Sequence, residues 1–409
     1  MNSGGKVLLI ANNFPPIRGG SAVVYDNLAR YSGGRVLVVA PSLQYADGLP
    51  MIGWREHDRR APYRVIRLPL LRTVIQDAPW RGQFAKLVFR ASDIWIRLRL
   101  AAALVHLVLR ERVAAICVGE LLASSWVLEL FRPLGRVRTV VYVHGEEITT
   151  EDPYDRTHAR ARRALLAADR IVVVSRFTLG AVRALLGPGS EERISLVENG
   201  VDTSRFRPLG KRVDLTELYR LANAFVFVSV CRLLEKKGID NAIRALAAVA
   251  AEPPECRFLI VGTGPYEEAL HAVAAAAGVA DKVVFAGEVS DEDLVAHYCL
   301  GDVFIMPNRE LPNGDTEGFG LVFLEANSCG LPVIAGRDGG SRDAVQHGAN
   351  GLVVDGTSVA DIAAAMLALR EDAELRLRLC VRGAEIAAAA DWRSKAQAFL
   401  DLCVAPAVA

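Results

Sequence analysis

Short apolar runs rich in β-branched residues alternate along the chain with longer segments that have helical spacing. These runs occupy 6–11, 35–40, 114–119, 138–145 and 170–175 in the first half, and 224–230, 257–262, 282–287, 303–307, 331–336 and 350–354 in the second. Both faces of the runs are apolar, which is typical of parallel strands covered by helices on both sides of a sheet. The alternation predicts an α/β protein with two doubly wound, Rossmann-like domains.

The length of the chain agrees with two domains, because 409 residues exceed what one hydrophobic core usually supports. The polar segment 198–210 separates the two series of strands and is the expected linker, which gives domains over 1–205 and 206–390. A last helical segment over 391–409 carries its apolar residues on one face. Other helices are expected over 239–252, 266–278, 291–301, 321–330 and 372–390.

The charge and the cysteine content of the chain argue against nucleic-acid binding and against a cysteine metal site. The 48 basic and 47 acidic side chains leave a net charge of +1, which gives no overall field for nucleic acid, so none is expected as a partner. The seven cysteines are scattered and lack metal-ligand spacing, which is typical of reduced thiols in a cytoplasmic protein. The start of the chain does not resemble a signal peptide, and the apolar run at 100–109 is shorter than the ~18–20 residues that span a bilayer.

Ligands of such domains lie at the carboxyl ends of the strands, so the loops there are the expected place for a site. Gly19 and Gly20 stand before a helix, where free amide groups and the helix dipole favour an anion, although a plain turn is equally compatible. Arg232 and Lys237 follow a strand of the second half and could flank a diphosphate, or could be solvated surface cations. Gly262 ends the next strand, either as a tight turn or as a ligand contact.

A histidine ends another strand, and two glutamates flank the start of a later helix. His144 ends a buried strand beside a glycine and is expected either in the site or as a satisfied structural residue. The segment 316–336 contains Glu317 in a glycine-containing loop and Glu325 about one turn into the next helix. The amide groups of Phe319, Gly320 and Leu321 would point toward a phosphate, whereas the carboxylates suit hydroxyl groups of a sugar and a ribose.

Taken together, several motifs resemble the retaining nucleotide-sugar glycosyltransferases of family 4, which have the GT-B fold. The motifs are 19-GG-20, 144-HG-145, 199-NGVDTSRFRP-208, 231-CRLLEKKG-238, 262-GTGP-265, 287-GEVSDEDL-294 and 317-EGFGLVFLE-325. The most specific is the pair of glutamates eight positions apart in the last motif, and the ordered set covers nearly the whole chain.

The resemblance implies a role for each matching residue. Glu317 would hold hydroxyl groups of the donor sugar, Glu325 would hold the ribose, and His144 would lie near the sugar and the acceptor. Arg232 and Lys237 would neutralise the diphosphate, and Val289 would meet the nucleobase through its backbone. The implied donor-binding set is Gly19, Gly20, Arg232, Lys237, Gly262, Val289, Gly318, Phe319, Gly320, Leu321 and Glu325, with Glu317 and His144 as catalytic residues.

The resemblance also implies that the final helix, with Trp392, crosses back onto the first domain, where the acceptor would bind. The sequence departs from the family pattern at Cys231, where the family often has glycine, and at Lys236, which adds a second lysine beside Lys237. These departures leave open which lysine reaches the phosphate. No acidic pair at a strand end and no cluster with ligand spacing suggests a metal site, so no metal or other cofactor is expected.

The expected activity is retaining transfer of a hexose from a nucleoside-diphosphate sugar to a hydroxyl acceptor in glycan or glycolipid biosynthesis. GDP-mannose is the first choice of donor, on the context 306-MPNRE-310 to 314-GDTEGFG-320, and a UDP-hexose is the second. A nucleotide-sugar epimerase and a catalytically inactive sugar- or nucleotide-binding protein of the same fold are the alternatives. A dehydrogenase fits poorly, because the first strand–helix turn lacks the dinucleotide fingerprint.

The segment 80–112 mixes basic and aromatic residues with many leucines, among them Trp80, Arg81, Arg90, Trp95 and Arg97. Such a helix could dock at an anionic bilayer surface, or it could be a core helix with a solvated arginine edge. The first interpretation predicts a lipid-linked acceptor and a peripheral enzyme on the inner face of the plasma membrane.

Overall fold

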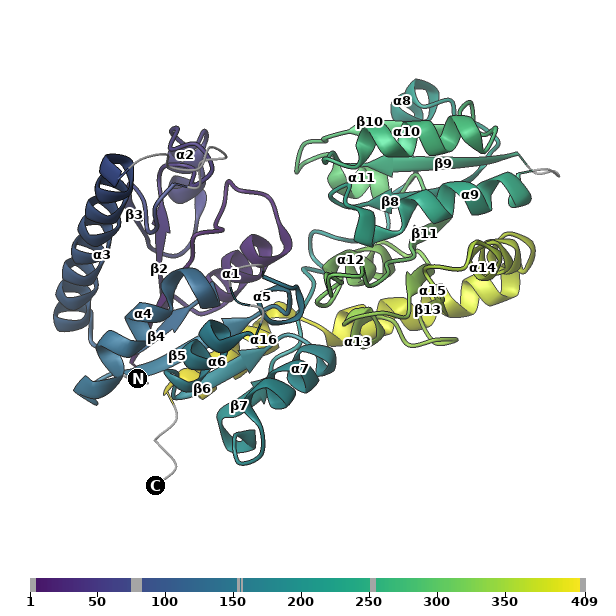
Figure 1. Ribbon diagram of the computed structural model, residues 1–409. Helices are drawn as coiled ribbons and strands as arrows, with labels where there is room; N and C mark the ends of the chain where they lie inside the picture. The colour runs from purple at the N-terminus through teal and green to yellow at the C-terminus, as the bar shows by residue number, and fades with distance from the viewer. Residues whose placement is uncertain (1–4, 75–82, 153–154, 156, 251–254, 405–409) are drawn as a thin grey trace.

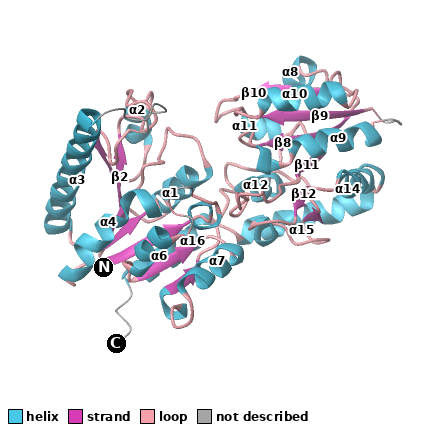
Figure 2. Cartoon of the chain, viewed as in Figure 1, coloured by secondary structure: helices cyan, strands magenta, loops and turns pink. Residues whose placement is uncertain are grey.

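The computed structural model describes residues 5–74, 83–152, 155, 157–250 and 255–404. The chain forms two α/β domains that lie side by side (Figure 1). Each domain is a parallel sheet with helices on both faces (Figure 2). The predicted fold class is confirmed, because the buried apolar runs became the strands of two parallel sheets.

The first sheet has seven strands in the order β3-β2-β1-β4-β5-β6-β7, and all its pairings are parallel. Its strands are β1 (Lys6–Ile10), β2 (Val36–Pro41), β3 (Val65–Leu68), β4 (Val113–Val118), β5 (Arg138–Val143), β6 (Arg170–Val173) and β7 (Ile194–Leu196). Its helices are α1 (Gly20–Arg30), α2 (Trp54–Arg60), α3 (Gln83–Glu111), α4 (Leu121–Phe131), α5 (Glu146–Thr149), α6 (Ala159–Leu166) and α7 (Arg176–Leu186), with the 3-10 turns η1 (Arg132–Leu134) and η2 (Glu191–Arg193). The edge strands β3 and β7 were not predicted.

The second sheet has six strands in the order β10-β9-β8-β11-β12-β13, again all parallel. Its strands are β8 (Phe225–Val230), β9 (Cys256–Val261), β10 (Val283–Gly287), β11 (Val303–Met306), β12 (Val333–Gly336) and β13 (Gly351–Val354). Its helices are α8 (Val213–Leu218), α9 (Ile239–Val249), α10 (Glu267–Ala276), α11 (Leu294–Tyr298), α12 (Leu321–Ser328), α13 (Ser341–Ala344), α14 (Val359–Glu371) and α15 (Ala373–Ala389), with the 3-10 turn η3 (Glu235–Lys237).

One predicted helix is shorter than expected. The helix expected over 291–301 is α11, which spans only Leu294–Tyr298. The Ser290 hydroxyl accepts a hydrogen bond from the Asp293 amide at 3.1 Å and donates to the Asp293 carboxylate at 3.0 Å. This is the hydrogen bond of an N-cap serine, but the regular helical bonds begin only where the His297 amide donates to the Asp293 carbonyl at 3.0 Å.

The chain crosses between the domains twice, and the two crossings lie side by side. The Val201 amide donates to the Ala390 carbonyl at 2.9 Å, and a Cβ atom at Gly200 would lie 2.6 Å from that carbonyl oxygen. After the second crossing, α16 (Trp392–Val404) packs against α1 and the first sheet (Figure 1). The buried Phe399 ring lies 5.9 Å from the ring of Tyr142 on β5.

Candidate active site

Two helix N-termini point to the region where the domains meet. Helix α1 begins at Gly20 and α12 begins at Leu321, and a Cβ atom at Gly20 would lie only 4.0 Å from the Leu321 side chain. Neither helix carries an acidic side chain in its first turn. Their free amide groups and positive dipole ends are therefore available to an anion.

The loop before α12 lies against the strand end that carries His144. A Cβ atom at Gly318 would be 3.3 Å from the His144 carbonyl carbon, and its oxygen is closer still. Gly320 has a φ of +86°, and a Cβ atom there would meet the Phe323 ring at 2.5 Å. Both positions therefore require glycine, one for close approach of the other domain and one for the left-handed start of the helix.

Glu317 and Lys237 form an ion pair from two neighbouring loops of the second domain. Both side chains are mostly buried, with 14% and 15% of their surface exposed. Burial alone would raise the pKa of the Glu317 carboxyl, but the charge and hydrogen bond of Lys237 hold that pKa below its ordinary value. Burial would likewise lower the pKa of Lys237, but Glu317 raises it. The pair is therefore charged on both sides.

Of the two adjacent lysines, Lys236 points away from Glu317. Its ammonium group is buried and binds Glu146 of the first domain, the Asp315 carboxylate at 2.8 Å and the Thr316 carbonyl at 3.2 Å. These partners occupy its three donors. Lys236 therefore ties the two domains together, and Lys237 is the lysine beside Glu317.

Arg232 lies in the same loop as these lysines and is exposed, and no other described residue forms a salt bridge with it. Gly262 packs against the backbone of this loop. Its φ is +122°, and the space of a Cβ atom there is taken by the Cys231 backbone. Gly262 thus forms a tight turn that holds the Arg232 loop, and its contact with a donor stays a prediction.

The His144 ring is neutral and has a fixed orientation. Its Nε2 atom lies 2.7 Å from the Tyr25 hydroxyl, and that hydroxyl donates its own hydrogen to the Gly119 carbonyl. Nε2 must therefore be the protonated nitrogen, which leaves Nδ1 as a hydrogen-bond acceptor. Burial lowers the pKa of His144 to about 4, which keeps the ring uncharged at neutral pH.

Two further carboxylates hold the strand ends, and the sequence reasoning missed both. Glu147 accepts the His144 amide at 3.0 Å and the Gly145 amide at 2.9 Å, and burial raises its pKa to about 7. Glu120, just after β4, accepts the amide groups of Asn12 and Asn13 at 2.9 and 3.0 Å, and burial raises its pKa. The available signal was an acidic residue one or two positions after a glycine at a buried strand end.

Glu325 and Val289 lie on the second domain, on the α12 and β10 side of the site. The Glu325 carboxylate accepts a hydrogen bond from the Tyr298 hydroxyl at 2.7 Å, and burial raises the pKa of Glu325.

The loop that carries Val289 is in contact with the first domain. The Val289 carbonyl accepts a hydrogen bond at 2.8 Å from Arg18, which also pairs with Glu288 at 2.7 Å. Arg18 directly precedes the Gly19–Gly20 pair, so the glycine loop of the first domain contacts the Val289 loop of the second. The sequence reasoning missed Arg18, whose signal was a cation beside a glycine pair.

Two protein-family profiles match the chain almost end to end. The profile of Glycosyltransferase Family 4 matches residues 18–205, and that of glycosyl transferases group 1 matches residues 215–385. The GDP-mannose-dependent alpha-(1-6)-phosphatidylinositol monomannoside mannosyltransferase of Mycobacterium tuberculosis H37Rv is 34% identical over 95% of this chain and 94% of its own. The chain belongs to glycosyltransferase family 4.

Other similar proteins agree with this assignment. The GDP-mannose-dependent monoacylated alpha-(1-6)-phosphatidylinositol monomannoside mannosyltransferase of Corynebacterium glutamicum is 27% identical to this glycosyltransferase over 96% of each chain. The Anabaena HepE structure in complex with UDP and glucose superimposes with a TM-score of 0.72 at 21% identity, covering 97% of this chain and 98% of HepE. The predicted family and the GT-B fold are thus confirmed.

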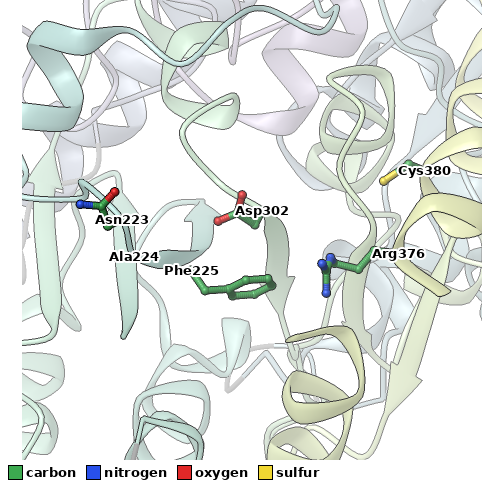
Figure 3. Close-up of a pocket in the computed structure, with 6 residues that line it drawn as sticks. All are labelled: Asn223, Ala224, Phe225, Asp302, Arg376 and Cys380. Atoms are coloured by element: carbon green, nitrogen blue, oxygen red, sulfur yellow. The ribbon is translucent and has the colours of Figure 1, made fainter. Parts of the chain in front are cut away.

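A separate hollow of about 450 Å³ lies on the second domain, lined by Asn223, Ala224, Phe225, Asp302, Arg376 and Cys380 (Figure 3). It is at the amino ends of β8 and β11, because Phe225 begins the first of these strands and Asp302 precedes the second. The Arg376 guanidinium covers the Phe225 ring at 5.2 Å. Ligands of parallel sheets bind at the carboxyl ends of the strands, so this hollow of the glycosyltransferase is separate from its candidate donor site.

Proposed function

We propose that this glycosyltransferase moves a mannosyl residue from GDP-mannose to a hydroxyl group of a lipid-linked acceptor, with retention at the anomeric carbon and without a metal ion. The observation that carries the proposal is the buried Lys237–Glu317 pair beside the start of α12, where α1 also begins. The choice of donor and acceptor is supported by the two mannosyltransferase relatives, whose names state GDP-mannose dependence and a phosphatidylinositol mannoside.

The chemistry follows from the charges. As the bond from the sugar C1 atom to the phosphate oxygen breaks, negative charge grows on the diphosphate, and Lys237, the exposed Arg232 and the amide groups at Gly20 and Leu321 can stabilise it. Preorganised groups of this kind stabilise a transition state by several kcal/mol. The acceptor oxygen forms the new bond to C1 on the same face, and its proton passes to the departing phosphate oxygen.

Glu317 and His144 position the sugar in this proposal. The Glu317 carboxylate is ionised and accepts hydrogen bonds from donor hydroxyl groups, while the neutral His144 ring offers Nδ1 as a second acceptor. Glu325 hydrogen-bonds to the ribose of the donor, and the Val289 backbone binds its base. Lys237 and the helix amides supply the positive charge that a divalent cation would otherwise provide, which is why EDTA should leave activity intact.

The donor and the mechanism can be tested together. GDP should raise the melting temperature more than UDP or ADP does, because a ligand that binds only the native state stabilises it. Glu317→Gln should lower kcat at least about 100-fold while GDP binding stays, because the lost interaction is made with the sugar and not with the nucleotide. NMR of the product should show retention. A larger shift with UDP, strict Mg²⁺ dependence or full turnover in Glu317→Gln would contradict the respective part of the proposal.

We also propose that the enzyme works at the inner, cytoplasmic face of the plasma membrane, and α3 carries this proposal. Its exposed side includes an apolar stripe of Phe84, Leu87, Ile94, Leu98, Val105 and Leu109. Lys86, Arg90 and Arg97 follow the same helix at helical spacing, and Trp80 and Arg81 of the predicted segment lie outside the described residues. Among the described helices, none combines the length and apolarity that crossing a bilayer requires.

Flotation with anionic vesicles tests this contact with a matched pair of variants. Leu87 on α3 and Leu377 on α15 are equally exposed, at 64%. Leu87→Asp should move the protein from the vesicle fraction to the soluble fraction, whereas Leu377→Asp should behave as wild type. Equal flotation of both variants would remove α3 from the proposed membrane contact.

A further inference from the structure

Helix α3 has an apolar inner stripe whose two halves have different surroundings. Leu100, Leu104 and Leu107 in the second half are buried in the core beneath the first sheet. In the first half, Phe89, Ser92 and Ile96 continue the same stripe and instead line a hollow of about 350 Å³. This volume is at the lower end of the roughly 300–1,000 Å³ that is typical of ligand pockets.

The other wall of this hollow is the segment 69–74, which follows the edge strand β3. The residues around the hollow are Pro69, Leu70, Thr73, Val74, Phe89, Ser92, Trp95, Ile96 and Arg99. Arg99 donates a hydrogen bond to the Leu70 carbonyl at 2.7 Å and so holds the two walls together. Most of the lining is apolar, and Trp95 also reaches the exposed face of α3, so the hollow is continuous with the proposed membrane-facing stripe.

The segment 69–74 also carries a cation between residues that line the hollow. Arg72 lies between Leu70 and Thr73, its guanidinium is 5.4 Å from the centre of the Tyr45 ring, and no other described residue forms a salt bridge with it. Its charge is near enough to Glu120 to oppose the rise in that carboxyl's pKa that burial causes. Glu120 stands at the end of β4 beside Gly119, and the Gly119 carbonyl accepts the hydroxyl of Tyr25, the partner of His144.

The spacing of the strands sets the length of this path. His144 follows β5, and β3 and β5 are four positions apart in the sheet; neighbouring strands are about 4.8 Å apart, so the ends of these two strands are separated by roughly 19 Å. A sugar head group, a phosphodiester and the first carbons of an acyl chain extend over a comparable length. One phospholipid can therefore reach from the strand ends near the candidate site, past Arg72, into the hollow.

We propose that the hollow between α3 and 69–74 binds one acyl chain of the acceptor phospholipid, and that Arg72 binds its phosphodiester. This inference rests on the proposed lipid-linked acceptor and adds the subsite that selects for the lipid. The exposed apolar stripe of α3 would lie in the bilayer surface, so the chain passes from the bilayer directly into the hollow. A deacylated acceptor would lose this contact and keep only those at its head group.

Calorimetry with monomeric dioctanoyl phosphatidylinositol, below its micellar concentration, tests the subsite without turnover. Ser92→Phe places a ring in the hollow and should weaken binding at least about tenfold, because the acyl chain loses its apolar contacts. Val74→Phe fills the hollow from the opposite wall and should do the same. Ala91→Phe adds the same ring one position along α3, outside the hollow, and should bind as wild type.

The phosphate contact has its own matched variants. Arg72→Gln should weaken binding of dioctanoyl phosphatidylinositol at least about tenfold and leave binding of neutral dioctanoylglycerol unchanged. Arg59→Gln, an exposed arginine of α2, should change neither. Equal affinities of Ser92→Phe, Val74→Phe and Ala91→Phe would overturn the acyl subsite, and equal effects of Arg72→Gln on both lipids would overturn the phosphate contact.

Activity measurements separate this inference from the proposed function. If the wild type binds the lipid as expected but no mannose passes from GDP-mannose to any mannosylated phosphatidylinositol, the proposed function fails and the subsite stands. If transfer occurs and Ser92→Phe prefers acylated over deacylated acceptor as strongly as Ala91→Phe does, the subsite fails and the proposed function stands.

Discussion

Replacing Gly318 by alanine tests whether the contact between the two domains sets the geometry of catalysis. Gly318 follows Glu317 directly, and its α carbon lies against the carbonyl group of His144 on the first domain. The Cβ atom of alanine would be 3.3 Å from that carbonyl carbon and inside the contact distance of its oxygen. The Gly318 φ is not in the left-handed region, so alanine brings no backbone strain of its own.

The overlap must be relieved by moving the two loops apart by about 1 Å, because a carbon and an oxygen atom do not approach more closely than roughly 3 Å. Gly340 packs on the other side, where its own Cβ atom would be 2.6 Å from the Gly318 carbonyl carbon, so the loop cannot retreat into its own domain. The domains must therefore separate at this point. A misplacement of about 1 Å costs roughly 100-fold in rate, which corresponds to about 2.7 kcal/mol in the activation free energy.

The assay is steady-state transfer from GDP-mannose with Gly318→Ala and a control glycine. Gly180→Ala is the control, since a Cβ atom there meets no atom within 4 Å and the position is inside α7. We expect kcat to fall about 100-fold in Gly318→Ala and to stay unchanged in Gly180→Ala, with both variants folded by circular dichroism. A turnover of Gly318→Ala within threefold of wild type would refute the reasoning that this contact positions Glu317 against His144.

Three further predictions concern stability. Lys236→Met should lower the free energy of unfolding by about 1–3 kcal/mol in urea titrations, because it leaves Asp315 unpaired in a partly exposed site. Phe399→Ala should cost about 3–5 kcal/mol by the same measurement, since it removes a buried ring between α16 and β5. The raised pKa of Glu147, about 7, contributes stability that is present below pH 4.5 and is lost as pH rises through 7. The stability of Glu147→Gln relative to wild type should therefore increase between pH 4.5 and 7, by up to about 3 kcal/mol, and a flat difference would show that the carboxyl has an ordinary pKa.

The sequence predicted most of the fold because buried parallel strands are apolar on both faces. The strand β1 was predicted over 6–11 and spans Lys6–Ile10, and β8 was predicted over 224–230 and spans Phe225–Val230. The missed strands β3 and β7 stand at the two edges of their sheet, have four and three residues, and include polar side chains such as Arg67. An edge strand needs fewer apolar positions, so its pattern does not separate it from a loop.

The sequence placed the groups of the candidate site but not their pairings. It put His144 at a strand end, and Glu317 and Lys237 in the connections between a strand and the next helix, where the structure has them, because these positions follow from the order of strands. It could not choose between Lys236 and Lys237, since two adjacent lysines look alike until the positions of Glu146 and Asp315 are known. The neutral state of His144 also depends on a partner, Tyr25, that is 119 positions away. These features arise from contacts between distant segments, which a single sequence does not show.

The double crossing between the domains restricts how the enzyme can move. A single linker allows rotation about many axes, but here the segments at Gly200 and Ala390 are hydrogen-bonded to each other through the Val201 amide. Because the two crossing segments are bonded to each other, they must bend together. A rotation of one domain against the other is therefore limited to a hinge with one principal axis. Two contacts outside the crossings also join the domains, Arg18 to Val289 and Glu146 to Lys236. Opening of the two domains about this hinge would have to break these two contacts, whereas the Val201–Ala390 hydrogen bond lies at the hinge itself.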